Sequence, residues 1–376
     1  MSFLPHPKPA LLAFGLAAAL VFPAQPVVAQ SPDDPARKPS EIMPMASRSL
    51  LLDVVAVGDT VYATGERGTV LRSNDRGSTW AQLEVPTRLA LTAVAAVGDR
   101  VWVAGHSGQI LSSADGGTTW TRQRLDVWTP DAFALNAGAP IFDLLFVDAS
   151  TGYAVGAFST LLRTRDGGAT WQALALKKEA EPAADDLSAA ADANAADEIA
   201  AEGSTNSDWV FSDDELTLDQ ETDPHLNAIV QTPDGALYVA GERGAMFRSS
   251  DAGERWDRLD FPYDGSMFGL MALGEGHVLA YGLRGNVFET TDAGQTWARL
   301  ETGTEATLQG GSALPQGGAL IVGNEGVLLR RDSGAQPLQL ELYTTDDGKT
   351  PVLSGAMRID NHVLVIGEEG VGHHGR

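Results

Sequence analysis

Acidic and basic side chains recur at fixed spacing in this sequence, and two of these patterns could do chemistry. In the first, an aspartate precedes a glycine and a tryptophan: "SNDRGSTW" ends at Trp80 and returns as "SADGGTTW", "TRDGGATW", "SSDAGERW" and "TTDAGQTW". In the second, an arginine stands in a glycine turn, as in "GERG" from Gly65 to Gly68. Repeated carboxylates suggest acid–base catalysis or metal binding, and repeated arginines suggest recognition of an anion or a protein.

Turn chemistry accounts for the aspartates of the first pattern. We expect each carboxylate to accept backbone N–H groups across a hairpin, each glycine to adopt a left-handed turn, and each tryptophan to be buried between sheets. One copy falls in each repeat, so no two carboxylates should lie close enough to cooperate. We therefore predict no catalytic residue, no metal and no cofactor. These structural residues are Asp75, Asp115, Asp166, Asp251, Asp292, Asp332, Trp80, Trp120, Trp171, Trp256 and Trp297.

The glycine turns mark seven repeats of one unit. Successive copies begin 40, 51, 85, 41, 41 and 44 residues apart, at Gly65, Gly105, Gly156, Gly241, Gly282, Gly323 and Gly367. Each unit has two short apolar strands before or at this glycine, a third after the turn, and most add a fourth after the aspartate motif. A period near 40 residues with several short strands is typical of propeller blades. The sequence therefore predicts an all-β, seven-bladed β-propeller of four-stranded antiparallel blades.

The seventh unit ends at "GEEGVGHHGR", too early to contain a fourth strand. We expect "EIMPMAS" (Glu41–Ser47) to supply that strand and close the ring, which removes exposed sheet edges. The propeller then spans residues 41–376. His373 and His374 form a weak metal-binding pattern, but a frayed end is the simpler interpretation.

The beginning of the chain predicts export. The thirteen apolar residues Ala10–Phe22 are too few to span a bilayer comfortably, so we interpret residues 1–29 as a signal peptide cleaved after Ala29. An uncleaved anchor is the alternative, and residues 30–40 are expected to be a flexible mature N-terminus. The chain has no cysteine, and its net charge of −24 argues against nucleic acid and anionic membranes as partners. We expect a periplasmic or secreted monomer that does not insert into the membrane.

An acidic insertion interrupts the repeat between the third and fourth units. Residues 177–224 hold fifteen acidic residues and two lysines, with neither of the repeated motifs. This composition predicts a largely disordered segment. It could form a charged lid, extend a docking surface toward a basic partner, or be a solvated loop.

The order of strands in a blade assigns the two patterns to opposite ends of the propeller. The turn between strands two and three lies at the same end as the links between blades, and the aspartate motifs lie at the other. We therefore expect Arg67, Arg243 and Arg284 to share one end of the propeller, which would also receive the acidic insertion and is the candidate partner-binding face. Arginines on exposed turns are equally well explained as solvated charges. The candidate residues are Arg67, Arg243, Arg284, His106, Trp128 and Phe133, the last two from the long link between Thr121 and Pro140.

Asp boxes that recur from blade to blade, with V-x-G-x-x-G turns and a signal peptide, resemble the photosystem II stability/assembly factor-like family of BNR/Asp-box β-propellers. The resemblance covers about Leu50 to Arg376 apart from the acidic insertion. It implies a non-enzymatic protein that binds proteins and assists assembly of a membrane complex, with an arginine-bearing face as the partner surface. For this chain it implies a partner among the membrane-protein complexes of the cell envelope.

Sialidases and related glycoside hydrolases also carry Asp boxes, so a sialidase-like hydrolase is the alternative function. Such a site needs an arginine triad, a Tyr/Glu pair and an acidic aspartate. The F/Y-R-I-P segment typical of sialidases does not occur in this sequence, and Arg48 stands in that region without it. A carbohydrate-binding propeller without turnover is a third possibility.

Overall fold

The computed structural model describes residues 33–126, 138–176 and 223–375. The expected signal peptide, Trp128, Phe133 and residues 177–222 of the acidic insertion lie outside the described residues. No described helix is long and apolar enough to cross a membrane. The following description concerns the unit Pro35–Arg376.

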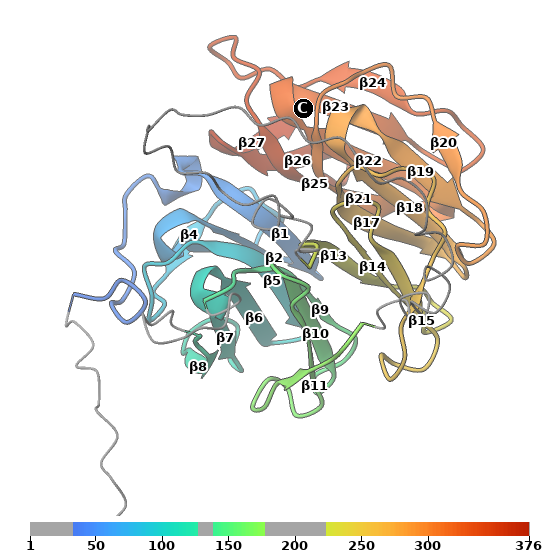
Figure 1. Ribbon diagram of the computed structural model, residues 1–376. Coiled ribbons are helices and arrows are strands. Elements are labelled where there is room, and N and C mark those ends of the chain that lie inside the picture. Colours follow the sequence, from blue (N-terminus) through green and yellow to red (C-terminus); the bar gives the residue numbers. More distant parts are fainter. Residues whose placement is uncertain (1–32, 127–137, 177–222, 376) are drawn as a thin grey trace, which may run out of the picture. The chain divides into compact units, whose positions relative to one another are not determined.

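Seven antiparallel sheets form a ring of blades, numbered 1 to 7 in chain order (Figure 1). Within each blade the strands follow one another from the centre outwards. The innermost strand of every blade contacts that of the next, and β25 contacts β1, which closes the ring. The predicted seven-bladed all-β propeller is confirmed. The innermost strands are β1 (Leu51–Val57), β5 (Leu91–Val97), β9 (Ile141–Phe146), β13 (Leu226–Gln231), β17 (Met267–Gly274), β21 (Leu308–Leu314) and β25 (Leu353–Ile359).

The remaining strands are short, as the frequent glycine and aspartate punctuation predicts. The second strands are β2 (Thr60–Gly65), β6 (Arg100–Gly105), β10 (Gly152–Gly156), β14 (Leu237–Gly241), β18 (His277–Gly282), β22 (Gly318–Gly323) and β26 (His362–Gly367). The third strands are β3 (Val70–Ser73), β7 (Ile110–Ser113), β11 (Leu161–Thr164), β15 (Met246–Ser249), β19 (Val287–Thr290), β23 (Val327–Arg331) and β27 (Gly370–His374). The fourth strands are β4 (Ala81–Leu83), β8 (Thr121–Arg124), β12 (Gln172–Ala173), β16 (Asp257–Arg258), β20 (Ala298–Leu300) and β24 (Gln339–Leu342).

Six one-turn 3-10 helices occur among the described residues, mostly in turns of the blades. They are η1 (Ala46–Arg48), η2 (Glu66–Gly68), η3 (His106–Gly108), η4 (Leu283–Gly285), η5 (Pro315–Gly317) and η6 (Asn324–Gly326).

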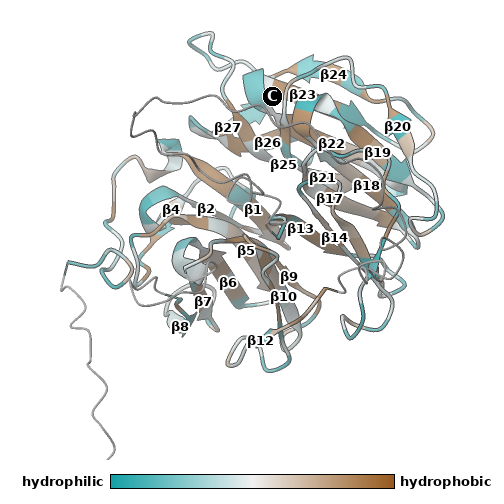
Figure 2. Cartoon of the chain, in the orientation of Figure 1, coloured by the Kyte–Doolittle hydropathy of each residue, from teal (hydrophilic) through white to brown (hydrophobic). Residues whose placement is uncertain are grey.

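The hydrophobic core lies between neighbouring blades. Almost every residue of the second strands is buried, because both faces of these strands pack on apolar side chains. One of the core clusters joins blades 2 and 3, where the rings of Trp102 and Phe146 stack with centroids 3.6 Å apart. Hydrophobic residues accordingly follow the strands in Figure 2, and hydrophilic residues concentrate in the turns.

A β-bulge near the start of each innermost strand connects the blades at the centre of the ring. The bulge leaves the second residue of the strand without a paired partner, for example Thr92 in β5 and Ser354 in β25. The Ser354 hydroxyl donates a hydrogen bond to the Leu51 carbonyl of blade 1 at 2.7 Å, and the Thr92 hydroxyl donates to the Ile141 carbonyl of blade 3. The Asn227 amide of blade 4 donates to the Met267 carbonyl of blade 5 at 3.0 Å. The bulged residues thus link successive blades.

Blade 7 differs from the prediction because it has three strands. Glu41–Ser47 contains no strand, and η1 begins within it at Ala46. Pro44 has no N–H to donate to a ladder, and the Gln82 side chain of blade 1 takes the neighbouring backbone groups. This amide accepts a hydrogen bond from the Met43 N–H at 2.7 Å and donates to the Glu41 carbonyl at 2.9 Å. The N-terminal segment is therefore fixed to the outer strand of blade 1 and does not pair with β27.

Two further expectations about the ends of the chain require correction. The described part of the expected flexible N-terminus is packed: Ala36 is buried, and the buried Ser40 donates its N–H to the Val85 carbonyl at 2.8 Å. His373 and His374 belong to β27 and are not frayed. His374 makes a 2.9 Å hydrogen bond with Glu341 of blade 6.

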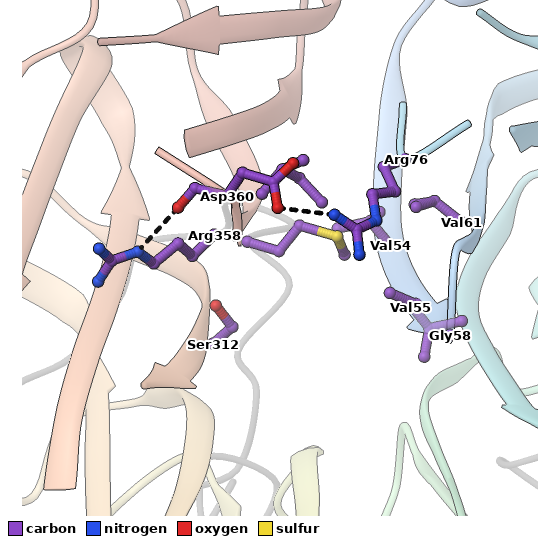
Figure 3. A pocket seen from close by; sticks show the side chains of 11 residues that line it. Val54, Val55, Gly58, Val61, Arg76, Ser312, Arg358 and Asp360 are labelled. Carbon is purple, nitrogen blue, oxygen red and sulfur yellow. Dashed lines mark hydrogen bonds and ion pairs between the residues drawn. The ribbon is translucent and has the colours of Figure 1, made fainter. Parts of the chain in front are cut away.

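The junction between blades 7 and 1 is closed by packing of β25 on β1 and of η1 on β27, together with contacts between side chains. Leu51 and Leu71 of blade 1 share a core cluster with Leu364 and Ile366 of blade 7. At the surface, the Arg76 guanidinium donates to the Asp360 carboxylate at 2.6 Å (Figure 3).

Candidate functional site

The propeller has two faces with different turns, as the strand order predicts. The Asp-box face carries the turns between third and fourth strands and those between first and second strands, which are hydrogen-bonded together, as between the Gly116 N–H and the Asp99 carbonyl. The link face carries the turns between second and third strands and the links between blades. A side chain at Gly285 of such a turn would lie 2.0 Å from the Thr304 carbonyl of the next link, so turn and link are in contact.

Each complete Asp box is satisfied by its own turn. In blade 1 the Asp75 Oδ1 accepts the Thr79 N–H at 2.8 Å and the Ser73 hydroxyl at 2.7 Å, and its Oδ2 accepts the Thr79 hydroxyl at 2.6 Å. The same bonds recur around Asp115, Asp166 and Asp292. Asp251 keeps the bonds from the Ser249 hydroxyl and the Arg255 N–H, both at 2.9 Å, but lacks the second hydroxyl bond because Arg255 replaces threonine. The central glycines have the predicted left-handed conformation, with φ of 79° at Gly77 and 95° at Gly168.

These bonds hold the Asp-box carboxylates in the ionised form. Hydrogen bonds from Thr79 and Ser73 lower the pKa of Asp75 to about 2, and equivalent bonds have the same effect at Asp115, Asp166 and Asp292. A carboxylate with such a low pKa is a poor general acid or base near neutral pH. The structural role predicted for the Asp boxes is therefore supported by their geometry.

Three Asp boxes are hydrogen-bonded by an aromatic side chain of the preceding blade. These contacts were not predicted from the sequence. The Tyr62 hydroxyl donates to the Gly116 carbonyl at 3.3 Å, Trp102 Nε1 to the Gly167 carbonyl at 2.9 Å, and the Tyr153 hydroxyl to the Ala252 carbonyl at 2.8 Å. All three donors occupy the same place in a second strand. The recurrence of an aromatic donor at this position can be seen in the sequence. The carbonyl that accepts its hydrogen bond lies in the next repeat, so the pairing cannot be read from one repeat alone.

The sixth Asp box is incomplete. Arg330 stands where the other boxes have serine or threonine, and its guanidinium donates to Asp332 at 2.8 Å. Gln336 and Pro337 replace the threonine and tryptophan. Arg358 of blade 7 lies 3.5 Å from the same carboxylate. Asp332 therefore takes part in surface ion pairs and does not close its turn.

Asp53 and Asp143 are carboxylates of the innermost strands β1 and β9. Because burial raises the pKa of both, we asked whether they could act as a catalytic pair. Asp53 accepts the N–H of Val94 in blade 2 at 2.7 Å, and Asp143 accepts the N–H of Ile229 in blade 4 at 2.9 Å. Burial raises the pKa of Asp53 to about 6, and burial together with the Asp53 charge raises that of Asp143 to about 7. The second oxygen of each accepts the N–H of the following residue at 2.7 Å. Both oxygens of each carboxylate thus already hold backbone groups, which makes these residues links between blades.

A cavity of about 460 Å³ opens between blades 1 and 7 near the Asp-box face (Figure 3). Val54 and Met357 contribute to its apolar wall, and Arg76, Arg358 and Asp360 are its charged residues. Arg76 is paired with Asp59 and Asp360, and Arg358 Nε donates to the Asp360 carbonyl at 3.3 Å. Among the described residues no group of three metal-ligating side chains occurs, here or elsewhere.

The turns of the link face share one backbone conformation and differ in their side chains. The third residue of the turn, called the tip, is left-handed in six blades although none is glycine. Such a conformation costs free energy for a residue with a side chain, and the residue that follows the tip is glycine in each of these blades except blade 3, where it is Ser159. The φ values are 55° at Arg67, 55° at Ser107, 54° at Phe158, 53° at Arg243, 56° at Arg284 and 60° at Glu325.

The predicted arginines share the link face but do not form one patch. Arg243 and Arg284 are exposed on the neighbouring blades 4 and 5, whereas Arg67 is on blade 1, across the ring. Arg67 Nε lies 3.8 Å from the Glu66 carboxylate, and the backbones of Asp264 and Glu305 in the links lie next to Gly244 and Gly285 of the turns that carry Arg243 and Arg284. His106 is also exposed on this face, on blade 2. Trp128 and Phe133 lie outside the described residues.

An aromatic cluster on the link face was not predicted as a site. Phe158, the tip of blade 3, is 38% exposed, and its ring lies 5.0 Å from that of His225. His225 is in turn 6.0 Å from Phe142, the bulged residue of β9. The available signal was the sequence "GAFS", where Ser159 replaces the glycine and Phe158 the usual polar tip.

Comparison with known proteins relates this chain to one family of propellers. A family model described as photosynthesis system II assembly factor YCF48 matches residues 34–134. The resemblance stated from the Asp boxes is confirmed by this match. A search of curated proteins found no match.

Several solved propellers have a similar structure. YCF48 bound to a D1 peptide is 15% identical with a TM-score of 0.60, and the alignment covers 89% of this chain and 94% of that chain. YCF48 from Cyanidioschyzon merolae gives the same identity and TM-score, covering 89% of this chain and 98% of that chain. The WD40 propeller domain of Doa1 is 12% identical with a TM-score of 0.60, covering 86% and 92%. At these identities the structures support the fold alone.

Proposed function

From the match to the photosystem II assembly factor model, we propose that this chain is a non-enzymatic propeller that binds protein and assists the assembly, stability or coupling of a membrane-protein complex of the cell envelope. It acts in the periplasm or outside the cell, after removal of the signal peptide predicted for residues 1–29. Its docking surface is the link face, and Arg67, Arg243, Arg284 and His106 are candidate contact residues.

The proposal rests on a difference between the side chains of the two faces. Asp-box side chains are consumed by their own turns, whereas the link-face tips are mostly exposed and vary between arginine, serine, phenylalanine and glutamate on one backbone conformation. Varied exposed side chains on a rigid scaffold are typical of recognition surfaces. The YCF48 structure with a D1 peptide is an example of a similar propeller that binds a segment of another protein.

Affinity capture from detergent-solubilised envelopes tests the proposal. The link-face variant replaces the tips of blades 3 to 6 by serine: Phe158→Ser, Arg243→Ser, Arg284→Ser and Glu325→Ser. Ser107 already adopts the same conformation with φ of 55°, so the turns should be preserved. The matched control is Arg255→Ser on the Asp-box face, where serine or threonine is the usual residue.

We expect the wild type and the control to capture the same membrane proteins, and the link-face variant to lose them. Equal capture by the link-face variant and the wild type would exclude this face as the docking surface. Hydrolysis of fluorogenic glycosides by the purified protein would support the glycoside hydrolase alternative instead.

A further inference from the structure

The link face combines exposed apolar side chains with an excess of carboxylates, and this combination indicates the chemistry of its partner. Resting on the protein-binding function proposed above, we propose that the face docks a basic segment that inserts one apolar side chain at Phe158. The anchor point is the aromatic cluster of Phe158, His225 and Phe142, and the surrounding carboxylates select lysine or arginine in the segment.

Phe158 is held outwards by a strained and well-supported turn. Both Phe158 and Ser159 are left-handed, with φ of 54° and 53°, which is unusual for two successive residues with side chains. The Phe158 N–H donates to His225 Nδ1 at 3.3 Å, and the Ser159 N–H donates to the Pro224 carbonyl at 2.9 Å. A bulky apolar side chain in such a turn costs stability without filling the core. Its fixed position suits an anchor, because little side-chain entropy is lost on binding.

Apolar exposure on this face is not restricted to Phe158. Large exposed hydrophobic side chains are uncommon in the described chain, and Leu50 and Val352, each 37% exposed, also lie at this end. Each directly precedes an innermost strand, in blades 1 and 7, and its carbonyl accepts the N–H of Glu66 or Glu368 in the adjoining turn. In blades 1 and 7 an exposed apolar side chain thus lies next to an acidic turn.

The charges of the link face favour a basic partner. Five carboxylates outnumber three arginines in the turns between second and third strands, and nine carboxylates stand against two basic side chains in the described parts of the links. The acidic residues of the turns are Glu66, Glu242, Glu325, Glu368 and Glu369. Those of the links are Glu84, Asp126, Asp223, Asp260, Asp264, Glu301, Glu305, Asp346 and Asp347, and the basic side chains there are Arg88 and Lys349.

Glu242 places this negative charge beside the aromatic cluster. Its carboxylate accepts the backbone N–H of His225 at 3.3 Å, and the Glu242 side chain remains about one-third exposed. A lysine or arginine next to an apolar residue in the docked segment could therefore pair with Glu242 while the apolar side chain packs on Phe158. Because carboxylates outnumber arginines in these turns and links, the arginine tips do not reverse the sign of the face.

Binding of labelled synthetic peptides to the full-length mature protein tests the inference. The probes are a twelve-residue lysine-rich peptide with one central phenylalanine, the same peptide with alanine at that position, and a glutamate-rich counterpart with phenylalanine. We expect the lysine-rich phenylalanine peptide to bind most tightly and to weaken with rising salt. Its alanine form should bind about fivefold to tenfold more weakly.

The variant Phe158→Ser makes the test specific to the anchor. We expect it to weaken the phenylalanine peptide by the same factor as the loss of the peptide's own phenylalanine, and to leave the alanine peptide unchanged. Phe158→Leu should restore most of the binding. Glu325→Ser, a tip with the same conformation on a distant blade, is the matched control and should affect both lysine-rich peptides equally. Thermal melting of each variant verifies that the fold is intact.

Three outcomes would overturn the inference: tighter binding of the glutamate-rich peptide, equal binding of the two lysine-rich peptides, or equal weakening of both by Phe158→Ser. These results are separable from the envelope capture experiment. If capture succeeds while the peptides show no preference, the proposed function stands and the partner chemistry is wrong. If the peptides behave as expected while no envelope protein is captured, the surface chemistry stands and the assembly function is wrong.

Discussion

The two faces of this propeller are built from equally regular turns, yet they use their side chains in opposite ways. On the Asp-box face, Asp75 and its counterparts repeat one set of bonds inside each turn. On the link face, only the backbone repeats, and the side chain at the tip changes from Arg67 to Ser107 to Phe158. The repeated bonds stabilise the turns of one face, whereas on the other face the side chains are free to differ from blade to blade.

The largest expected effect comes from removing a clamp of the Asp-box face. Trp102 is 1% exposed, stacks on Phe146 and donates to the Gly167 carbonyl. Trp102→Ala should lower the free energy of unfolding by about 3–5 kcal/mol, because it leaves a cavity and breaks the bond to the next blade. Urea unfolding measures this loss. Trp102→Phe should cost clearly less, and equal costs of the two changes would show that ring packing contributes little.

A smaller effect should separate complete from incomplete Asp boxes. Asp115→Ala removes the acceptor of the Thr119 N–H and hydroxyl, so the melting temperature should fall by roughly 3 °C. Asp332→Ala removes only exposed ion pairs with Arg330 and Arg358, so its melting temperature should stay close to that of the wild type. Differential scanning calorimetry compares the two variants. Equal destabilisation would contradict the distinction drawn between the boxes.

The smallest expected effect concerns how stability depends on pH. The Asp-box aspartates and the buried Asp143 should change the stability in opposite directions as the pH rises. The Asp-box pKa values of about 2 lie below the unfolded value near 3.8, so their stabilising contribution is present above pH 4 and is lost as the pH falls toward 2. Asp143, with a pKa raised to about 7, contributes stability that is present below pH 4 and is lost as the pH rises through 7.

Melting temperatures measured from pH 2 to pH 8 check both signs. The melting temperature should rise from pH 2 to about pH 4 and then decline toward neutral pH. In Asp143→Asn the decline between pH 4 and pH 7 should be shallower, while the acid limb is unchanged. An identical decline in this variant would mean that Asp143 does not titrate as its burial implies.

Much of the architecture could be predicted from the sequence because it repeats. The six G-x-x-G turns, the related G-x-x-S turn of blade 3 and the Asp boxes of Asp75, Asp115 and Asp166 fix the number of blades and the order of strands. Strand order in turn predicts that Arg67, Arg243 and Arg284 share one face. Local turn chemistry acts within a few residues, so the letters of one repeat are sufficient to recognise it.

Interactions between repeats were harder to predict. The bonds from Trp102 to Gly167 and from Tyr153 to Ala252 join residues 65 and 99 positions apart. The expected closing strand in Glu41–Ser47 failed for a similar reason, because the Gln82 side chain competes for its backbone groups. The arginines were assigned to the correct face, but the link residues that pack on their turns, such as Asp264 and Glu305, have positions that depend on the whole ring.

The junction between blades 7 and 1 is the seam of this molecule. Elsewhere a covalent link ties each blade to the next, whereas here the ring is held by the Ser354 bond to Leu51, the Arg76 pair with Asp360 and one shared apolar cluster. Among the described residues blade 7 has three strands, so no shared sheet reinforces that closure, and only η1 of the N-terminal segment packs on β27 there. A ring with one such seam can open without tearing any blade apart. The seam is therefore where fluctuations of the native state, and the action of a protease on it, should begin.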